Sequence, residues 1–528
     1  MKVKKIRNSI VKVATIIFTI LFILIVLNTI FFNKTIQIQF FSVVLITGTI
    51  IGFGAIFLLY KTELFGMYNK ISKTIRENKI LTWIIIFALQ LILINLINAR
   101  SGWDCIILLD NSFKLYQGTD ITGVYFSIYP NNLLSLIILK YLYVTTGLFT
   151  NVTAENYYFI AIIFNTILVD LAAILTISTC KKILGEKTAF LSYLFIIPLM
   201  LFFPNIIVPY TDTFSLFIPI GIFYLYLKIK DNTKMKFLYV LLEGILIMGG
   251  YLLKPTCVIM GIAIVLVEIF YFSFKNMENK IIKIRNFIIM ILILVVGITT
   301  TYGTYKYLEN KNISKYITEE QFEKNSTPYT HFIMMGMQSY EMAGKPCYGA
   351  WNQFDAVNTQ KIPGQKAKKE YNKEIIKQRL NDFGFTGYVE FVYNKINWIA
   401  SDGTFYYWQE GTQKYLPENQ SRIAKHIQKF FNIETEEYQK VTANFLEVLW
   451  ILILIGIVFS YKDRDKMSNI LKTSIIGIIL FIVIFEGRSR YLYNYISIFI
   501  IVGTMGVKNI LQYLDKKILQ IKTKKDKI

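Results

Sequence analysis

Long runs of apolar residues recur along the whole chain, and the polar positions between them fall in short clusters. Many of these runs approach the roughly 20 residues that an α-helix needs to cross a bilayer. Thirteen apolar segments stand out: 10–32, 37–60, 80–98, 130–148, 157–179, 188–205, 213–227, 237–253, 256–273, 284–302, 446–461, 473–485 and 491–507. The pattern predicts a polytopic all-α membrane protein with about 12–13 transmembrane helices.

Positive charge is concentrated in the short polar stretches between these segments. The chain carries 57 Lys and Arg against 35 Asp and Glu, for a formal net charge of +22. Seven stretches hold 32 of these bases but only 9 of the acids: 1–12, 61–79, 181–187, 228–236, 275–285, 462–472 and 508–528. Cytoplasmic loops of membrane proteins are enriched in Lys and Arg. We therefore place these stretches in the cytoplasm, and we expect membrane lipid and no nucleic acid as a partner.

Composition supports the same class of protein. Only 17% of the residues are charged, whereas about a quarter is usual for soluble globular chains. This excludes an ordinary soluble enzyme. The four cysteines show no metal-ligand spacing, so we expect no disulfide framework, although Cys105 and Cys347 both fall in segments that we place outside.

One apolar segment is expected not to cross the membrane. Thirteen crossings would put the two basic termini on opposite sides, whereas the positive-inside rule places both in the cytoplasm. The conflict lies between an outer loop at 99–129 and the basic stretch at 181–187, which leaves 130–148 and 157–179 as the alternatives. We favour 130–148 as a re-entrant or interfacial helix, because it opens with Pro130 and carries Lys140.

The same topology divides the chain into four regions. Residues 1–302 form a transmembrane region that contains the first outer loop, 99–129. Residues 303–445 are long enough to fold as an extracytoplasmic domain. The last three transmembrane helices occupy 446–507, and 508–528 form a basic cytoplasmic tail.

The remaining ionisable residues gather at the predicted outer boundary of the membrane. Ionisable groups beside a membrane are costly and mark functional sites. The main members are Arg100, Asp104, Asp110, Lys114, Asp120, Asp212, Lys254, Glu486, Arg488 and Arg490. Such a set suits chemistry on a lipid phosphate: a carboxylate takes the proton of an acceptor hydroxyl, and cations stabilise the departing phosphate. The planar fork of Arg can bind two phosphate oxygens.

Several short motifs in these places resemble one enzyme superfamily. They are Trp103-Asp104, Tyr129-Pro130-Asn131-Asn132, VPYTD at 208–212, LKP at 253–255, TPYTHFIMMGM at 327–337, KINWIASDGTF at 395–405 and EGRSRYLY at 486–493. Together they resemble the GT-C superfamily of polyprenyl-phosphate-sugar-dependent glycosyltransferases. The resemblance is to a Gram-positive branch related to protein mannosyltransferases and aminoarabinose transferases.

The resemblance implies a GT-C-like fold and an inverting glycosyltransferase of the hexosyltransferase type. It implies a polyprenyl-phosphate-linked sugar as donor and an envelope polysaccharide, teichoic acid or other glycan as acceptor. It also implies a multi-pass protein of the bacterial cell membrane, with the active site facing outside. The first outer loop lacks the adjacent Asp-Glu pair of many relatives. The use of a divalent metal as cofactor therefore stays open, as do the sugar, the acceptor and the linkage.

Each candidate residue has a functional and a structural interpretation. We predict Asp104 and Asp212 as catalytic, Arg488, Arg490 and Lys254 as donor phosphate-binding, and His331, Trp398, Asp402 and Tyr129 as acceptor- or sugar-binding. Asp104 could instead pair with Arg100, and Asp212 could cap a helix. Lys254 could extend to the interface, and Glu486 could neutralise the two arginines. His331 and the aromatic cluster around Trp398, Tyr406, Tyr407 and Trp408 could be packing groups.

The alternative function is a transporter or flippase of a lipid-linked or envelope substrate. A transporter favours charges near mid-span and two related halves, whereas the rare charges here lie at the outer rim beside a long outer loop. A non-catalytic scaffold needs none of these charges. The enzyme hypothesis predicts that Asp104 lies close to Asp212, Arg488 and Arg490, because catalytic and phosphate-binding groups must meet around one substrate.

Overall fold

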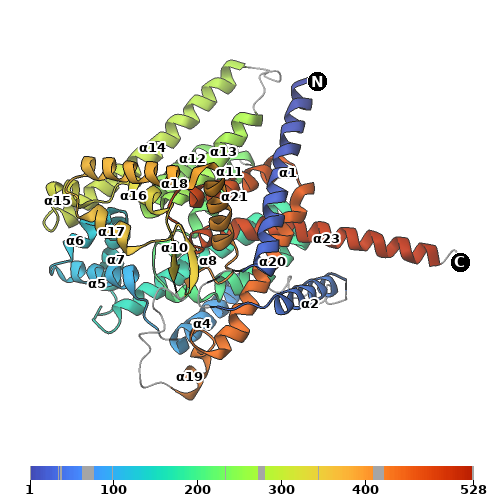
Figure 1. The fold of residues 1–528 in the computed structure, drawn as a ribbon, viewed down its shortest axis with the longest axis horizontal. Coiled ribbons are helices and arrows are strands. Elements are labelled where there is room, and N and C mark those ends of the chain that lie inside the picture. The colour runs from blue at the N-terminus through green and yellow to red at the C-terminus, as the bar shows by residue number, and fades with distance from the viewer. Residues whose placement is uncertain are drawn as a thin grey trace.

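The computed structural model is almost entirely helical (Figure 1). It describes residues 2–33, 35, 38–61, 77–97, 99–231, 234–271, 280–342, 344–407 and 421–525. Within them, eleven helical segments are long and apolar enough to cross a membrane. The predicted class, a polytopic all-α membrane protein, is confirmed.

Most of these segments are single helices. They are α1 (Lys2–Phe31), α2 (Ser42–Lys61), α4 (Lys79–Ile97), α8 (Tyr157–Leu184), α12 (Lys236–Leu253), α14 (Lys280–Ile313), α21 (Lys466–Ile484) and α23 (Ile496–Lys525). Three others combine a main helix with short helical turns: α9 (Glu186–Ile196), α11 (Phe217–Asp231) and α20 (Ala443–Phe459). A shorter apolar helix covers Pro255–Tyr271 and consists of η4 (Pro255–Cys257) and α13 (Val258–Tyr271).

The segment at 130–148 forms a short helix that packs against the region 99–129, which is predicted to be the first outer loop. After the turn η1 (Pro130–Asn132), α7 runs over Leu133–Thr146, and its 14 residues give a length of about 21 Å. This is shorter than the roughly 30 Å hydrocarbon core. Its main neighbour is α5 (Trp103–Gln117), which precedes the short helix α6 (Gly123–Ile128). Pro255–Tyr271 is a second apolar helix shorter than the eleven spans, and its α13 portion also has 14 residues. The number of crossings, and with it the placement of both termini on one side, therefore stays a prediction.

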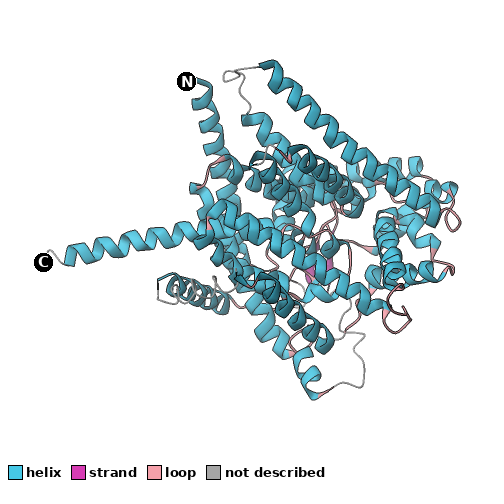
Figure 2. Ribbon diagram, turned by 180° about the vertical axis from the view of Figure 1, so that it is seen from behind, coloured by secondary structure: helices cyan, strands magenta, loops and turns pink. Residues whose placement is uncertain are grey.

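The long loop predicted at 303–445 is structured and mostly helical. Helix α14 continues past residue 302 to Ile313 and leads into α15 (Glu319–Asn325), α16 (Tyr329–Met335), α17 (Gln353–Gln360), α18 (Gln365–Ala400) and α19 (Arg422–Gln428). An antiparallel hairpin of β1 (Ser339–Met342) and β2 (Lys345–Tyr348) lies between α16 and α17. Figure 2 shows this hairpin surrounded by helices. That this region faces the cell exterior remains a prediction.

Helix α18 brings this region down to the transmembrane bundle. The helix bends at Gly384, whose φ of 58° breaks the helical geometry. Beyond the bend, the amide of Asn28 on α1 donates a hydrogen bond of 2.7 Å to the Tyr393 hydroxyl. The residues from Phe391 to Ala400 are largely buried against α1 and α21. The second half of α18 therefore belongs to the same packed body as the spans.

Small residues allow the closest helix crossing in the bundle. Helices α20 and α23 meet at Gly456, Gly503 and Gly506, and a Cβ atom at Gly506 would collide with the Gly456 backbone. Close backbone approach at glycines is a common basis of helix association in membranes. The crossing fixes the position of α23 against α20. Arg488 and Arg490 lie in the segment that leads into α23.

Candidate functional site

Asp104 lies in the first turn of α5, where two tyrosine hydroxyls reach its carboxylate. Tyr125 donates a hydrogen bond of 2.9 Å to Oδ1, and the Tyr210 hydroxyl lies 3.5 Å from Oδ2. Burial, followed by the charge of Asp104, raises the pKa of Tyr125, so Tyr125 stays a proton donor. Among the described residues Arg100 forms no ion pair with Asp104 and instead packs over the Tyr158 ring. The carboxylate is thus held by neutral donors.

Asp212 and Lys254 form a buried ion pair. Lys254 ends α12 and Asp212 lies in the first turn of α10 (Thr211–Phe214), with exposed fractions of 8% and 7%. The alternative of Asp212 as an N-cap is wrong, because Tyr210 occupies that position. Lys254 also lies over the Tyr491 ring, 4.7 Å from its centroid. Because the Lys254–Asp212 pair is neutral overall, it adds no net positive charge for binding a phosphate.

Arg488 is a buried cation in the loop between α21 and α22 (Arg490–Tyr493). Its guanidinium lies 4.4 Å from the centroid of the Tyr406 ring, and only 5% of the residue is exposed. Its Nη1 atom has no hydrogen-bond partner in the part of the chain that the structure describes. Burial lowers the pKa of Arg488 to about 10. A buried guanidinium in this state is costly unless an anion accompanies it.

Glu486, the expected neutralising partner, does not reach Arg488. Its carboxylate accepts a hydrogen bond of 3.1 Å from the Tyr491 hydroxyl, and among the described residues it forms no ion pair with either arginine. Burial raises the pKa of Glu486, and the nearby charge of Arg490 opposes this shift. We call residues 485–490 the cationic loop; among the described residues, no carboxylate forms an ion pair with its Arg488.

Two tyrosine rings join the acidic and basic groups into one cluster. The Arg490 guanidinium carbon lies 5.8 Å from the Tyr210 ring centroid and 5.7 Å from that of Tyr491. Tyr210 thus contacts Arg490 with its ring and Asp104 with its hydroxyl, and Tyr491 lies beside both Arg490 and Lys254. We call Asp104, Asp212, Lys254, Arg488 and Arg490, together with these two tyrosines, the site cluster.

Tyr129, Asp402 and Trp398 border this cluster. The Tyr129 ring centroid lies 5.3 Å from that of Tyr125, whose hydroxyl binds Asp104. Burial, followed by the charges of Asp104 and Glu486, raises the pKa of Tyr129. Asp402 is buried and accepts a hydrogen bond of 2.5 Å from Ser489, the residue between the two arginines. Burial also raises the pKa of Asp402. Trp398 is 7% exposed and is a packing group in this conformation. Trp408 lies outside the described residues.

His331 lies apart from the site cluster. Its Nδ1 atom is 2.8 Å from the Thr359 hydroxyl, within a buried network that joins α16, α17 and α18. Burial lowers the pKa of His331 to about 4. The described contacts of His331 are with its own region, which matches its structural interpretation.

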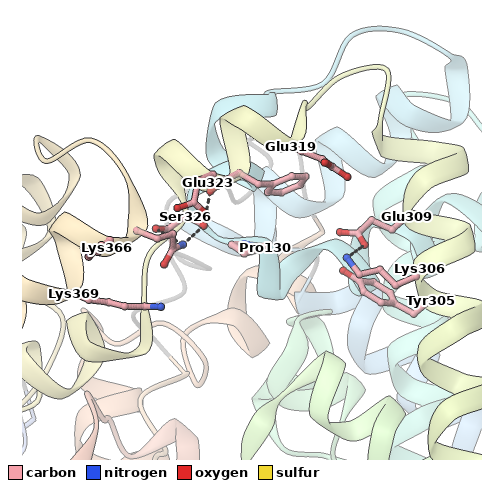
Figure 3. Close-up of a pocket in the computed structure, with 11 residues that line it drawn as sticks. Pro130, Tyr305, Lys306, Glu309, Glu319, Glu323, Ser326, Lys366 and Lys369 are labelled. Atoms are coloured by element: carbon pink, nitrogen blue, oxygen red, sulfur yellow. Dashed lines mark hydrogen bonds and ion pairs between the residues drawn. The ribbon is translucent and has the colours of Figure 1, made fainter.

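The site is closed, but a large cleft opens beside it. Two cavities of about 10 Å³ each lie among Tyr210, Arg490, Asp402 and Tyr406, which is room for about one water molecule. A cleft of about 670 Å³ lies between the end of α14, α15 and the start of α18 (Figure 3). Pro130, which follows Tyr129, lines this cleft together with glutamates and lysines such as Glu323 and Lys369.

The described residues contain no group of three or more His, Cys, Asp or Glu side chains placed to hold a metal ion. The two predicted acids also have other partners, as Asp212 binds Lys254 and Asp104 accepts from Tyr125.

The similarity of the chain to known families agrees with this architecture. A family model described as a conserved hypothetical integral membrane protein (CHIM_prot) matches residues 3–511. The chain belongs to this family. No curated protein and no solved structure shows significant similarity to it. Family membership supports the multi-pass membrane location and specifies no activity.

Sequence reasoning assigned no role to the groups that position the cluster, although Asn132, Tyr210 and Lys395 stand in the motifs at 129–132, 208–212 and 395–405. Tyr125, Tyr210 and Asn132 form a hydrogen-bonded set around Asp104, and Asn132 donates 2.9 Å to the Tyr125 hydroxyl. Lys395 is fully buried below the cationic loop. Lys395 precedes Trp398 and Ile399 by three and four residues, which places all three on one face of α18. This spacing could have predicted a functional or structural role for Lys395, because a lysine on an apolar helix face needs buried hydrogen-bond acceptors.

Proposed function

We propose that this protein is a membrane glycosyltransferase that transfers a sugar from a polyprenyl phosphate to a cell-envelope acceptor outside the cytoplasm. The observation that carries the proposal is Arg488, a buried guanidinium with a free donor and no carboxylate partner among the described residues. A phosphate diester supplies the missing anion, and guanidinium groups bind phosphate oxygens in pairs. The resemblance of the surrounding motifs to the GT-C superfamily supports the same donor class.

Asp104 is the proposed general base. Its carboxylate takes the proton of the acceptor hydroxyl while the acceptor oxygen bonds to the anomeric carbon of the sugar. The bond from that carbon to the phosphate oxygen breaks, and its electron pair leaves with the polyprenyl phosphate. Attack opposite to the leaving group inverts the anomeric centre. Tyr125 and Tyr210 orient the carboxylate without neutralising it.

Arg488 and Arg490 are proposed to stabilise the leaving phosphate. Both belong to one short loop, and Arg490 shares Tyr210 with Asp104. Because Lys254 is paired with Asp212, we give this pair the role of supporting Tyr491 and Arg490 rather than direct phosphate contact. The acceptor is proposed to bind in the cleft that Pro130, the residue after Tyr129, lines. The small cavities inside the cluster require the loop to move when a donor enters.

The test is turnover by the purified protein with polyprenyl-phosphate sugars, measured as released polyprenyl phosphate. Asp104→Asn should lower turnover by about 10²–10⁴-fold, the usual effect of losing a general base. Asp110→Asn is the matched control, since Asp110 lies on the same helix and also accepts from a tyrosine, Tyr157, away from the site cluster. Near-normal turnover of Asp104→Asn would exclude Asp104 as the base. Movement of lipid across the bilayer without sugar transfer would favour a transporter.

A further inference from the structure

A narrow apolar groove lies at the end of the bundle opposite to the site cluster. Helices α1, α13 and α21 enclose about 230 Å³ there, and Phe18, Phe270 and Ile476 are among its walls. On α1 the groove runs from Ile10 to Phe18, which is about 12 Å along the helix axis. One leaflet of the hydrocarbon core is roughly 15 Å deep. The groove therefore spans most of the depth of a single leaflet and can hold part of a lipid acyl chain.

The mouth of this groove is polar and cationic. The Arg7 guanidinium carbon lies 4.8 Å from the centroid of the Tyr271 ring, and Asn469 donates a hydrogen bond of 2.7 Å to the Tyr271 hydroxyl. The Arg7 Nε atom is buried and has no hydrogen-bond partner in the described part of the chain. Lys472 also lines the groove. Its ammonium group donates to two backbone carbonyls, those of Ser460 and Asp463, at 2.7 Å each.

The nearby carboxylates that the structure describes form no ion pair with these two cations. Glu268 on α13 is bound to Lys466 at 2.5 Å and to Lys230 at 2.9 Å. Asp463, whose backbone carbonyl accepts from Lys472, accepts at its carboxylate from Asn509 at 2.7 Å, and Asp465 caps the first turn of α21. Among the described residues, neither Arg7 nor Lys472 forms an ion pair with a carboxylate. Arg7, which packs over the Tyr271 ring at the mouth of the groove, is thus a cation without a carboxylate partner in the described part of the chain.

We propose that this groove binds an anionic phospholipid of the cytoplasmic leaflet, with its headgroup phosphate at Arg7 and an acyl chain between α1, α13 and α21. The charge pattern of the sequence places this end in the cytoplasm, where anionic lipids are attracted to basic protein surfaces. A zwitterionic lipid carries an ammonium group that Arg7 and Lys472 repel, which favours the anionic class. The proposal does not depend on the enzymatic function.

The experiment is native mass spectrometry of the full chain taken from nanodiscs that contain equal amounts of phosphatidylglycerol and phosphatidylcholine. The wild type should retain phosphatidylglycerol selectively. Arg7→Gln should weaken this retention about tenfold, the effect of losing one charge-assisted hydrogen bond. Ala14→Trp, which fills the groove wall on α1, should abolish it.

Arg285→Gln provides the matched control. Arg285 is exposed near the start of α14, which points to the same side of the molecule as the start of α1 (Figure 1). This variant loses one cation from that side but leaves the groove intact, so it should retain phosphatidylglycerol as the wild type does. Equal retention of both lipids by the wild type would overturn the proposal. Wild-type retention by both Arg7→Gln and Ala14→Trp would overturn it as well.

Discussion

The ammonium nitrogen of Lys395 lies 2.7 Å from the carbonyl oxygen of Phe485, the C-cap residue that follows α21. The same nitrogen donates to the carbonyls of Gly336 at 2.6 Å and Val483 at 3.2 Å. A buried lysine thus satisfies the last carbonyls of two helices, α16 and α21, where a cation is electrostatically favoured. Glu486 and the rest of the cationic loop follow directly, so Lys395 fixes the point from which that loop starts.

We predict that Lys395→Met weakens donor binding as well as folding stability. The substitution leaves three buried carbonyls without their donor, at a cost of roughly 1–3 kcal/mol, and it releases the start of the loop that carries Arg488. Thermal unfolding and binding of a polyprenyl-phosphate sugar are the measurements.

The matched control for this prediction is Lys368→Met. Lys368 is equally buried in α18 and donates 2.7 Å to the Asn325 carbonyl, but it contacts no part of the cationic loop among the described residues. It should lose stability and keep donor affinity. If the two variants change donor affinity equally, Lys395 has only a structural role.

We predict that Arg488→Met stabilises the protein without its donor and abolishes donor binding. Removing a buried, unpaired guanidinium relieves a desolvation cost, and replacement of buried charges by apolar side chains often stabilises a fold by about 1–4 kcal/mol. Opposite changes in melting temperature and donor affinity are the signature of a binding group. Loss of stability together with unchanged donor binding would argue that Arg488 serves packing through Tyr406.

We predict strong coupling between Asp212 and Lys254. Asp212→Asn or Lys254→Met alone leaves one buried charge unpaired, at a cost of roughly 3–5 kcal/mol. The double variant removes both charges and should cost clearly less than the sum of the single effects. A double-mutant cycle on unfolding stability measures this coupling, and additive effects would contradict the ion pair.

We predict that His331 makes the stability of the protein fall in acid. Its pKa is about 4 in the fold against 6.5 as the ordinary value, so between these values the unfolded chain binds a proton that the folded chain does not. Stability is therefore lost as the pH falls from 6.5 towards 4, by up to roughly 3 kcal/mol.

The His331 prediction is checked through the pH dependence of the melting temperature. His331→Gln should flatten the acid side of this profile, because the titrating ring is absent. His426→Gln, at the exposed second histidine, should leave the profile of the wild type unchanged. An identical profile for His331→Gln and the wild type would contradict the prediction.

The sequence by itself determined the class of the protein and the approximate positions of its apolar helices along the chain. Length and apolarity of a segment are local properties that a bilayer selects directly. The same reasoning singled out 130–148, since the parity of crossings and the basic termini left few segments to omit. The charge pattern also predicted that the rare ionisable residues lie together at one end of the bundle, because it assigns each loop to one side of the membrane.

Only the tertiary structure decided which of these charges are paired. Asp212 forms an ion pair with Lys254, which lies 42 residues further along the chain. Arg488 has no carboxylate partner among the described residues, and His331 is hydrogen-bonded within a network separate from the site cluster. These outcomes depend on how each helix is rotated about its axis and which neighbours it packs against. A hydropathy pattern with apolar residues on all faces carries almost no information on that rotation. The side-chain partners therefore emerge only when the whole bundle is assembled.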